Sequence, residues 1–452
     1  MALWYVDNTA SGSNNGTSWT NAWQTAGAIT GLTPGDTVYI SGGTSGQTYS
    51  WPVDWSPTDG TAGNPITFAV GQDTGHTGMV TFTRSGSSVR NSFLFAHTTY
   101  YVTINGEVSG QRRMTIDSTY AYVFINDISV DDKHLRFLYL EWNGPGVWAN
   151  GAYYEIAYCY GISSAVTDGL DDSFINHIGD GVGASSGYGL SSIHHNYFQV
   201  ARLQTSGLGY DLFKYTANTD IYNNICISAY QATYNGGQHN DGYQGNGSYV
   251  RIFNNYFENF ISFPIYYEIL ANTSNVLIYN NVMKAKESGV DWGAYIGVVV
   301  RSGSGPFTID NIIVSNNTLV GNQDAPAGRT LGIHFNNGAK THTATNCYVV
   351  NNLFYGNLET VASAGAVTVS NNVLNDASVS FVSNDVYPTG NFRLLIGATA
   401  AIDQGISPSY LTSIYTTDAD GFLRNVGAWD LGAYEFGTGV PVSTLAILRR
   451  FL

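Results

Sequence analysis

Apolar and polar residues alternate through much of the chain, and from Ile193 to Leu374 they do so around one recurring phrase. The phrase is an apolar residue, any residue, a pair of asparagines, any residue and a second apolar residue. It occurs at Ile221–Cys226, Ile252–Phe257, Ile278–Met283, Val314–Leu319, Val349–Phe354 and Val369–Leu374, with a near match at Ile193–Phe198. The second asparagines of successive copies are 31, 26, 36, 35 and 20 residues apart. A fixed phrase at such a period predicts a solenoid with loops of variable length.

The chemistry of the phrase predicts strands on both sides of a bend. Alternating apolar and polar residues are typical of strands with one buried face. Asparagine between them is the non-glycine residue that best tolerates the left-handed conformation of a tight bend. In a stack of coils, equivalent side chains lie about 4.8 Å apart, so their amides can bond to one another as a ladder. The asparagine pairs themselves, such as Asn254–Asn255, are therefore expected to be structural.

This pattern resembles the right-handed parallel β-helix of the pectate-lyase-like superfamily, which includes polysaccharide lyases and phage tailspikes, and in which asparagine ladders line an internal turn. The resemblance covers roughly residues 61–378. It implies an all-β fold, a single-stranded parallel β-helix with a cap at its N-terminal end and another at its C-terminal end.

The caps and coils are expected in chain order. Residues 1–60 are predicted to be an N-terminal cap with a short helix near Ala22, residues 61–378 the β-helix, residues 379–436 a C-terminal capping segment, and residues 437–452 a tail. A cap is required because an open end coil would expose apolar residues and unpaired strand edges. The C-terminal segment resembles the closing segment of many bacterial β-helix proteins, which packs onto the last coil, and Asp418 and Asp420 are expected to serve it.

The coils before residue 191 are less regular, and there the asparagine ladder is expected to start in degraded form. Asn105, Asn126, Asn143 and Asn176 lie near the expected bends.

The amino-acid composition limits which binding partners and which cellular location are expected. The formal net charge is -15 and only 11% of residues are charged, which argues against nucleic acid because phosphate binding needs a basic face. No apolar run is long enough to span a membrane, and no signal peptide is visible at the start of the sequence. A low charge with abundant Gly and aromatic residues suits an extracellular or virion-associated protein. We expect a monomer or, as in tailspikes, a homotrimer.

Candidate chemistry lies on segments that precede the asparagine pairs. Counting back from each pair aligns Asp180, Asp211 and Asp241 in one column. The same counting puts Lys214, Gln244 and Glu268 in a neighbouring column, with Arg301 and His334 on later coils and His239 just before Asp241. Like charges one coil apart repel and raise one another's pKa, so structure alone does not favour such a stack.

The residues therefore suggest catalytic roles for Asp241, His239, Lys214, Asp211 and Asp180. Asp180, Asp211 and Asp241 would hold calcium through hard oxygen ligands, with no organic cofactor. Lys214 or His239 would be a base, and Arg301 would pair with a substrate carboxylate. The expected substrate-binding residues are Tyr243, Gln244, Glu268, Arg301, Tyr267 and Trp292, with Tyr266 as a further ring that could stack on the apolar face of a sugar.

These features favour an enzyme that cleaves an extracellular, uronate-containing polysaccharide, most simply a polysaccharide lyase acting by β-elimination. A first alternative is a glycoside hydrolase on the same face, with Asp180 and Asp241, or Asp211 and Glu268, as its paired carboxylates. A second alternative is a non-catalytic glycan-binding adhesin or phage tail-fibre protein. Product chemistry separates them: only a lyase leaves an unsaturated sugar.

Overall fold

The computed structural model divides the chain into two compact units, Met1–Ser206 and Gly207–Arg450. It describes residues 1–50, 58–83, 99–117, 124–126, 133–144, 146–149, 151, 153–163, 173–176, 187–200, 211–228, 240–260, 262–284, 294–300, 306–321, 331–336, 343–356, 362–363, 366–374, 376–424 and 428–437. No helix among these residues has the length and apolar character needed to cross a membrane.

The first unit consists of parallel sheets that the chain visits in turn. Sheet I contains β1 (Leu3–Val6), β2 (Thr37–Ile40), β4 (Ile66–Val70), β6 (Val102–Asn105), β11 (Leu135–Leu138), β14 (Tyr154–Ala157) and β17 (Ser191–His194). Sheet II contains β3 (Gln47–Ser50), β5 (Val80–Thr83), β9 (Met114–Asp117), β12 (Leu140–Asn143), β15 (Tyr160–Ser163) and β18 (Tyr197–Val200). Sheet III contains β10 (Phe124–Asn126), β13 (Val147–Ala149) and β16 (Ser173–Asn176).

The second unit repeats this order of sheets. Its sheet I contains β20 (Thr219–Tyr222), β23 (Val250–Phe253), β26 (Thr273–Tyr279), β29 (Thr308–Ser315), β33 (Cys347–Val350) and β36 (Val367–Ser370), with β32 (Thr343–Thr345) also beside β29. Sheet II contains β21 (Ile225–Ser228), β24 (Tyr256–Glu258), β27 (Val282–Lys284), β30 (Thr318–Val320), β34 (Leu353–Tyr355) and β37 (Val373–Leu374). Sheet III contains β19 (Asp211–Lys214), β22 (Tyr243–Gly245), β25 (Ile265–Ile269), β28 (Ala294–Val300), β31 (Leu331–Asn336) and β35 (Ala362–Ser363).

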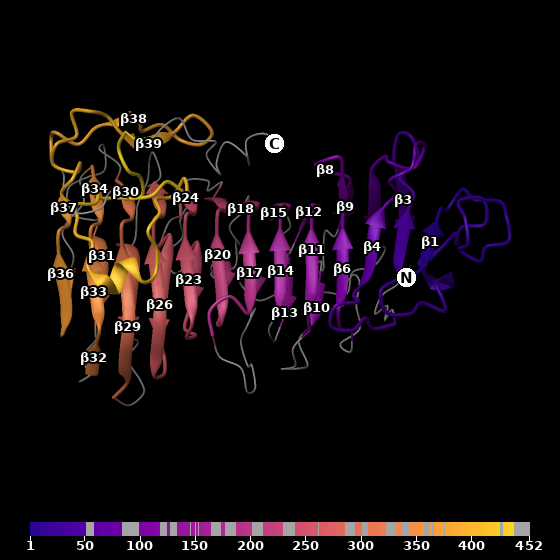
Figure 1. Ribbon diagram of the computed structural model, residues 1–452, viewed down its shortest axis with the longest axis horizontal. Helices are drawn as coiled ribbons and strands as arrows, with labels where there is room; N and C mark the ends of the chain where they lie inside the picture. Colours follow the sequence, from indigo (N-terminus) through magenta and orange to yellow (C-terminus); the bar gives the residue numbers. More distant parts are fainter. Residues whose placement is uncertain are drawn as a thin grey trace, which may run out of the picture. The chain divides into compact units, whose positions relative to one another are not determined.

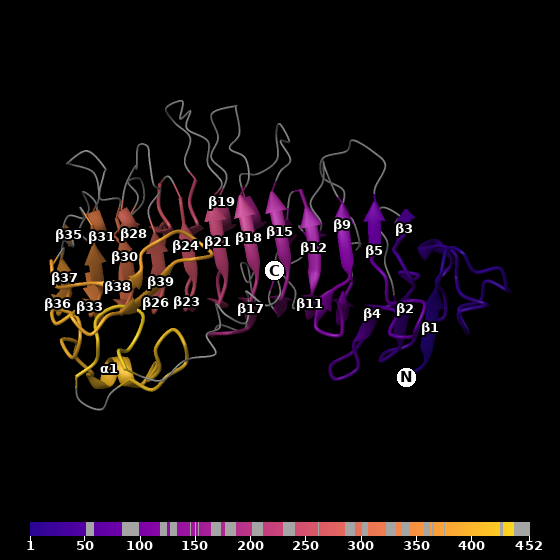
Figure 2. The ribbon, with the colours of Figure 1, turned by 90° about the horizontal axis from the view of Figure 1, so that it is seen from above.

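Each unit is a right-handed parallel β-helix, as the sequence predicts. The strands of sheet I run upward in Figure 1, and those of sheet II then run away from the viewer, as Figure 2 shows from above. This is the connection sense that parallel strands of one sheet adopt almost without exception. The remaining elements are short: a 3-10 turn at Ala26–Ala28, the hairpins β7 (Glu107–Val108) with β8 (Gln111–Arg112) and β38 (Phe381–Ser383) with β39 (Asn391–Leu394), and α1 (Ser409–Thr412).

The core of the second unit is a stack of aliphatic side chains from the recurring phrase. Its first residues pair in register from coil to coil: Ile221, Ile252, Ile278, Val314, Val349 and Val369. The first five are 0% exposed, whereas Val369 on the last coil is 40% exposed. Since burying such a side chain contributes about 1.5–3 kcal/mol, stacking of coils supplies the stability that no single coil has.

The two asparagines of each pair have different structural roles. The first members have left-handed backbones, with φ between 50° and 59° at Asn223, Asn254, Asn280, Asn316, Asn351 and Asn371. The second members form the ladder: the side-chain Nδ2 of Asn224 donates to Oδ1 of Asn255 over 3.0 Å, and the same bond recurs through Asn281, Asn317, Asn352 and Asn372. The predicted ladder is thus confirmed for these coils.

In the first unit the equivalent bends differ from the sequence expectation. Asn105, Asn126, Asn143 and Asn176 are each the last residue of a strand, near a bend as expected, but none of them has the positive φ of the first asparagines. The bend residues with positive φ are instead Tyr139, Tyr158 and His195. Ring stacking compensates for the left-handed backbone there: the centroids of Tyr139 and Tyr158 lie 4.7 Å apart, and those of Tyr158 and His195 lie 5.1 Å apart. The ladder begins only at Asn196, whose Oδ1 accepts the N–H of Cys159.

The two ends of the chain are more closely joined to the coils than the predicted caps at residues 1–60 and 379–436 imply. Strands β2 and β3 pair in register with β4 and β5, so coils begin within the residues assigned to the N-terminal cap. The C-terminal segment lies alongside several coils of the second unit rather than only on the last coil (Figures 1 and 2). Nδ2 groups of Asn280, Asn316 and Asn351 donate to carbonyls of Thr417, Asp430 and Ile406, respectively.

Asp418 acts as a turn cap within this C-terminal segment. Its Oδ1 accepts the N–H groups of Asp420 and Phe422, each over 2.9 Å.

Candidate functional site

Sheet III of the second unit carries the residues that the sequence analysis singled out. One column of paired residues faces the core and is 0% exposed: Phe213, Tyr243, Ile265, Ile296 and Ile333. The next residue of each strand points to the opposite side of the sheet, which gives a second column of Lys214, Gln244, Tyr266, Gly297 and His334. We call this second set the outward column. The predicted pairing of Lys214 with Gln244 is confirmed.

Glu268 does not belong to the outward column, and its predicted place beside Gln244 is wrong. Tyr266 pairs with Gln244, and Glu268 pairs with Val299, farther along the strands. Glu268 lies on the same side of the sheet as Tyr266 and is 1% exposed. Counting back from the asparagine pairs failed because the connection between sheet III and sheet I changes length from coil to coil.

Tyr243 and Tyr267 face the core, which corrects their assignment as sugar-stacking residues. Both are 0% exposed, and their ring centroids lie 6.0 Å apart. The Tyr243 hydroxyl accepts a hydrogen bond from Thr216 Oγ1 over 3.1 Å. Since the strand alternation turns both rings inward, they fill the core and leave Tyr266 as the outward ring.

Asp211 and Asp241 lie on adjacent coils, as predicted. The N–H of Asp241 donates to Oδ1 of Asp211 over 2.9 Å, and the N–H of Phe263 donates to Oδ1 of Asp241 over 2.9 Å. The carboxylates are 0% and 2% exposed. Each therefore caps the start of the next coil, which is a structural use that the sequence analysis did not foresee.

Calcium binding by these two carboxylates stays a prediction of the sequence. Each accepts a backbone N–H through its Oδ1 and is buried. Among the residues that the structure describes, no group of three or more His, Cys, Asp or Glu side chains could hold a metal ion. Asp180, the third expected ligand, lies outside the described residues, as do His239, Arg301 and Trp292.

Lys214 is the cationic member of the outward column. Its Nζ lies 3.9 Å from Oδ2 of Asp211 and 5.1 Å from the ring centroid of Tyr215, and its side chain is 11% exposed. Gln244 beside it is 5% exposed. Polar groups on the outer side of a sheet are usually solvated, and burying them is costly unless they are paired. Their burial in a row marks the outward column as the candidate site.

An aromatic platform lies in the same column. The rings of Phe263 and Tyr266 stack with centroids 4.7 Å apart. A Cβ on Gly297 would come within 2.8 Å of the Phe263 ring and 3.1 Å of the Tyr266 ring, so only glycine lets them lie there. The sequence analysis missed Phe263 and Gly297, although a glycine inside a strand signals close approach of another group.

His334 is the member of the outward column on β31. Burial lowers the pKa of His334 below its usual value. Its imidazole is therefore neutral at neutral pH, able to accept or donate a hydrogen bond without carrying charge.

No protein-family model and no curated protein matches this chain. Among solved structures it is similar to a pectate lyase, at 17% identity, with 96% of each chain covered and a TM-score of 0.47. It is also similar to a rhamnogalacturonan lyase, at 12% identity, with 99% of this chain and 98% of the other covered and a TM-score of 0.38. A third is a family 6 polysaccharide lyase from Pseudopedobacter saltans, at 12% identity, with 76% and 89% covered and a TM-score of 0.37. Similarities this distant carry no argument about what this chain does.

Proposed function

We propose that this protein is a polysaccharide lyase that cleaves an extracellular, uronate-containing polysaccharide by β-elimination at the outward column. The observation that supports the proposal is the position of Lys214. Its side chain lies on the outer side of sheet III and is only 11% exposed, with Gln244 and Tyr266 following it on successive coils. A base, a polar contact and an aromatic surface thus follow one line along the coils, which suits a linear polymer.

The chemistry requires a base near the C5 proton of the uronate. In its neutral form, the Lys214 amine takes that proton. The C5–H electron pair then forms the C4–C5 double bond, the C4–O4 bond breaks, and the leaving oxygen takes up a proton from solvent. Positioned proton transfer of this kind contributes about 10²–10⁴ in rate.

The neighbouring residues bind and orient the sugar. The Gln244 amide offers a donor and an acceptor for hydroxyls, and the Phe263–Tyr266 platform offers an apolar surface for the C–H face of a ring. Pairing of Arg301 with the substrate carboxylate, His239 as an alternative base and calcium binding stay predictions of the sequence. No step is assigned to calcium, and activity before and after dialysis against a chelator tests that prediction. Whether the chain works as a monomer or as a homotrimer is likewise a prediction.

The test is a substrate screen that reads unsaturated product by ultraviolet absorbance and new reducing ends in parallel. Alginate, pectin, glycosaminoglycans and bacterial capsules are the substrates. We expect one uronate polymer to give both signals, and Lys214→Ala to reduce both by about 10² or more. Lys284→Ala is the matched control, because Lys284 lies in sheet II, where its amine donates to the carbonyl of Asn384.

Each other result has a clear meaning. Reducing ends without absorbance would identify a glycoside hydrolase and overturn the elimination. Retardation in a glycan gel without either signal would identify a binding protein. Full activity in folded Lys214→Ala would remove Lys214 from the mechanism.

A further inference from the structure

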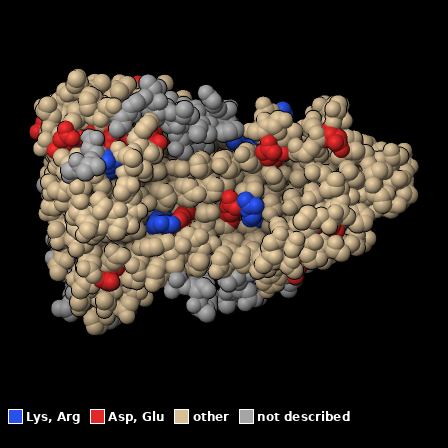
Figure 3. All heavy atoms as spheres, viewed as in Figure 1, with Lys and Arg blue, Asp and Glu red and all other residues tan. Residues whose placement is uncertain are grey.

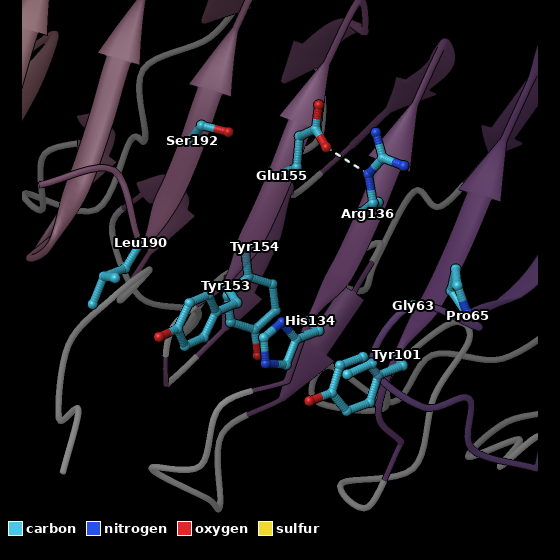
Figure 4. A pocket seen from close by; sticks show the side chains of 11 residues that line it. Gly63, Pro65, Tyr101, His134, Arg136, Tyr153, Tyr154, Glu155, Leu190 and Ser192 are labelled. Atoms are coloured by element: carbon cyan, nitrogen blue, oxygen red, sulfur yellow. Dashed lines mark hydrogen bonds and ion pairs between the residues drawn. The ribbon is translucent and has the colours of Figure 1, made fainter. Parts of the chain in front are cut away.

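The first unit has a hollow on the outer side of sheet I, far along the chain from the residues of the proposed lyase site. Its volume is about 410 Å³, within the range of small-ligand pockets. Three rings line it, those of Tyr101, His134 and Tyr153, and farther along the strands β11, β14 and β17 lie Arg136, Glu155 and Ser192 (Figure 4).

The ring wall is continuous. The centroids of Tyr101 and His134 lie 4.3 Å apart, and those of His134 and Tyr153 also lie 4.3 Å apart. All three residues are half-buried and line the hollow, so part of each ring stays accessible. The wall therefore offers an apolar surface several coils long.

The three ring residues have strained backbones, so their position in the fold does not by itself favour these residue types. Tyr101, His134 and Tyr153 have φ of 54°, 54° and 64°, in the left-handed region that bulky residues avoid. The second unit has left-handed residues at the equivalent position of its coils, and there it uses asparagine: Asn218 and Asn346 just before β20 and β33, and Asn275 and Asn311 inside β26 and β29. Tyr249, with φ of 59°, is the exception in that set. Asparagine tolerates this backbone conformation at a lower cost in free energy. The presence of Tyr and His here therefore points to a function of their side chains.

The part of the hollow beyond the rings contains an ion pair with no net charge. Arg136 Nε donates to Oε2 of Glu155 over 2.5 Å, and His194 Nε2 lies 3.3 Å from Oε1. The hydrogen bond from His194 and the pairing with Arg136 lower the pKa of Glu155 to about 2, so the carboxyl is ionised. Within the described part of the chain Arg136 has Glu155 as its partner, which leaves its Nη groups for a ligand, and its side chain is 48% exposed.

The stacked rings together with the Arg136–Glu155 pair indicate which class of ligand the hollow can bind. A free carboxylate or phosphate would compete with Glu155 for Arg136, so an anion gains little there. Figure 3 shows few charged groups on this face, and several of them touch a charge of opposite sign. Adjacent hydroxyls of a sugar suit the pair, because they can accept from Arg136 and donate to Glu155. The C–H face of a pyranose packs well on aromatic rings.

We propose that this hollow is a binding site for a neutral saccharide, independent of the lyase site. The stacked rings bind the apolar face of the sugar, and Arg136 with Glu155 binds its hydroxyls. A site of this kind would hold the chain on neutral glycans that accompany an acidic polysaccharide.

The test is calorimetric titration of the full chain with cellohexaose, xylohexaose and mannohexaose, and with hexagalacturonate as the acidic comparison. We expect binding of at least one neutral hexasaccharide, with little change between low and high salt because no net charge is involved. Tyr153→Asn should weaken binding about tenfold, since it removes a stacking contact worth about 1.4 kcal/mol while keeping a residue that suits positive φ.

The control variant is Tyr249→Asn, which makes the same change at the same backbone position in the second unit and should leave binding unchanged. Arg136→Gln should also weaken binding, which keeps the test decisive if Tyr153→Asn misfolds. Lys214→Ala should bind the neutral sugar normally, so failure of the lyase proposal would not affect this one. The proposal is overturned by absence of binding to every neutral hexasaccharide, by salt-sensitive preference for hexagalacturonate, or by equal loss in Tyr249→Asn.

Discussion

Asp241 donates its backbone N–H to the Oδ1 of Asp211 across 2.9 Å, so a carboxylate on one coil fixes the start of the next. Both side chains are essentially buried, at 0% and 2% exposure. The relationship repeats one coil later, where Phe263 donates to Asp241. These acids thus connect successive coils at the edge of the candidate site.

Asp211→Ala should destabilise the second unit by about 1–3 kcal/mol, because it leaves the buried N–H of Asp241 without an acceptor. Asp211→Asn keeps an oxygen in place and should cost less. Denaturant unfolding followed by circular dichroism measures both. Equal losses in the two variants would mean that charge, rather than the hydrogen bond, is what Asp211 supplies.

Gly297→Ala should raise KM severalfold with a smaller effect on kcat, because the added Cβ would meet the rings of Phe263 and Tyr266 and displace the platform. Tyr266→Ala should have a similar effect by removing the outer ring. Steady-state kinetics on the polymer found in the screen measures the change. Unaltered KM in both variants would exclude the platform from substrate binding.

Asn317→Ala should cost more than about 3 kcal/mol, since it leaves several buried groups without partners at once. Its Nδ2 donates to the carbonyls of Ile278 and Ser315, and its Oδ1 accepts from Asn281. Asn372→Ala is the matched comparison at the end of the ladder, where the side chain is only half-buried and water can replace the lost bonds. Thermal and urea unfolding give the two costs, and similar values would argue against a cooperative ladder.

The stability of the C-terminal segment should fall as the pH rises from about 4 to 6. Burial raises the pKa of Asp430 from 3.8 to about 6, so in this window the folded protein keeps a proton that the unfolded chain releases. Burial also raises the pKa of Asp420 to about 6, with the same sign. Asp430→Asn should flatten the dependence, as measured by urea unfolding at pH 4, 5, 6 and 7. An unchanged slope in the variant would assign the effect to other groups.

The sequence by itself determined the coil. Apolar residues such as Ile252 and Ile278 around each asparagine pair specify inward stacking, and Asn254 and Asn255 specify the left-handed bend and the ladder rung. The apolar residues and the asparagine pairs are local features that repeat. They can therefore be recognised in the sequence without knowing which coils are neighbours.

Tertiary structure decided the site. Loops of different length separate sheet III from the asparagine pairs, so Glu268 could not be placed by counting, while strand pairing puts Tyr266 beside Gln244. Sequence also did not distinguish Tyr243, which the pleat turns inward, from Tyr266, which it turns outward. The bond from Asn316 to Asp430 joins residues 114 apart in the chain. Such contacts depend on how the coils stack, because in a solenoid only the three-dimensional register decides which distant residues become neighbours.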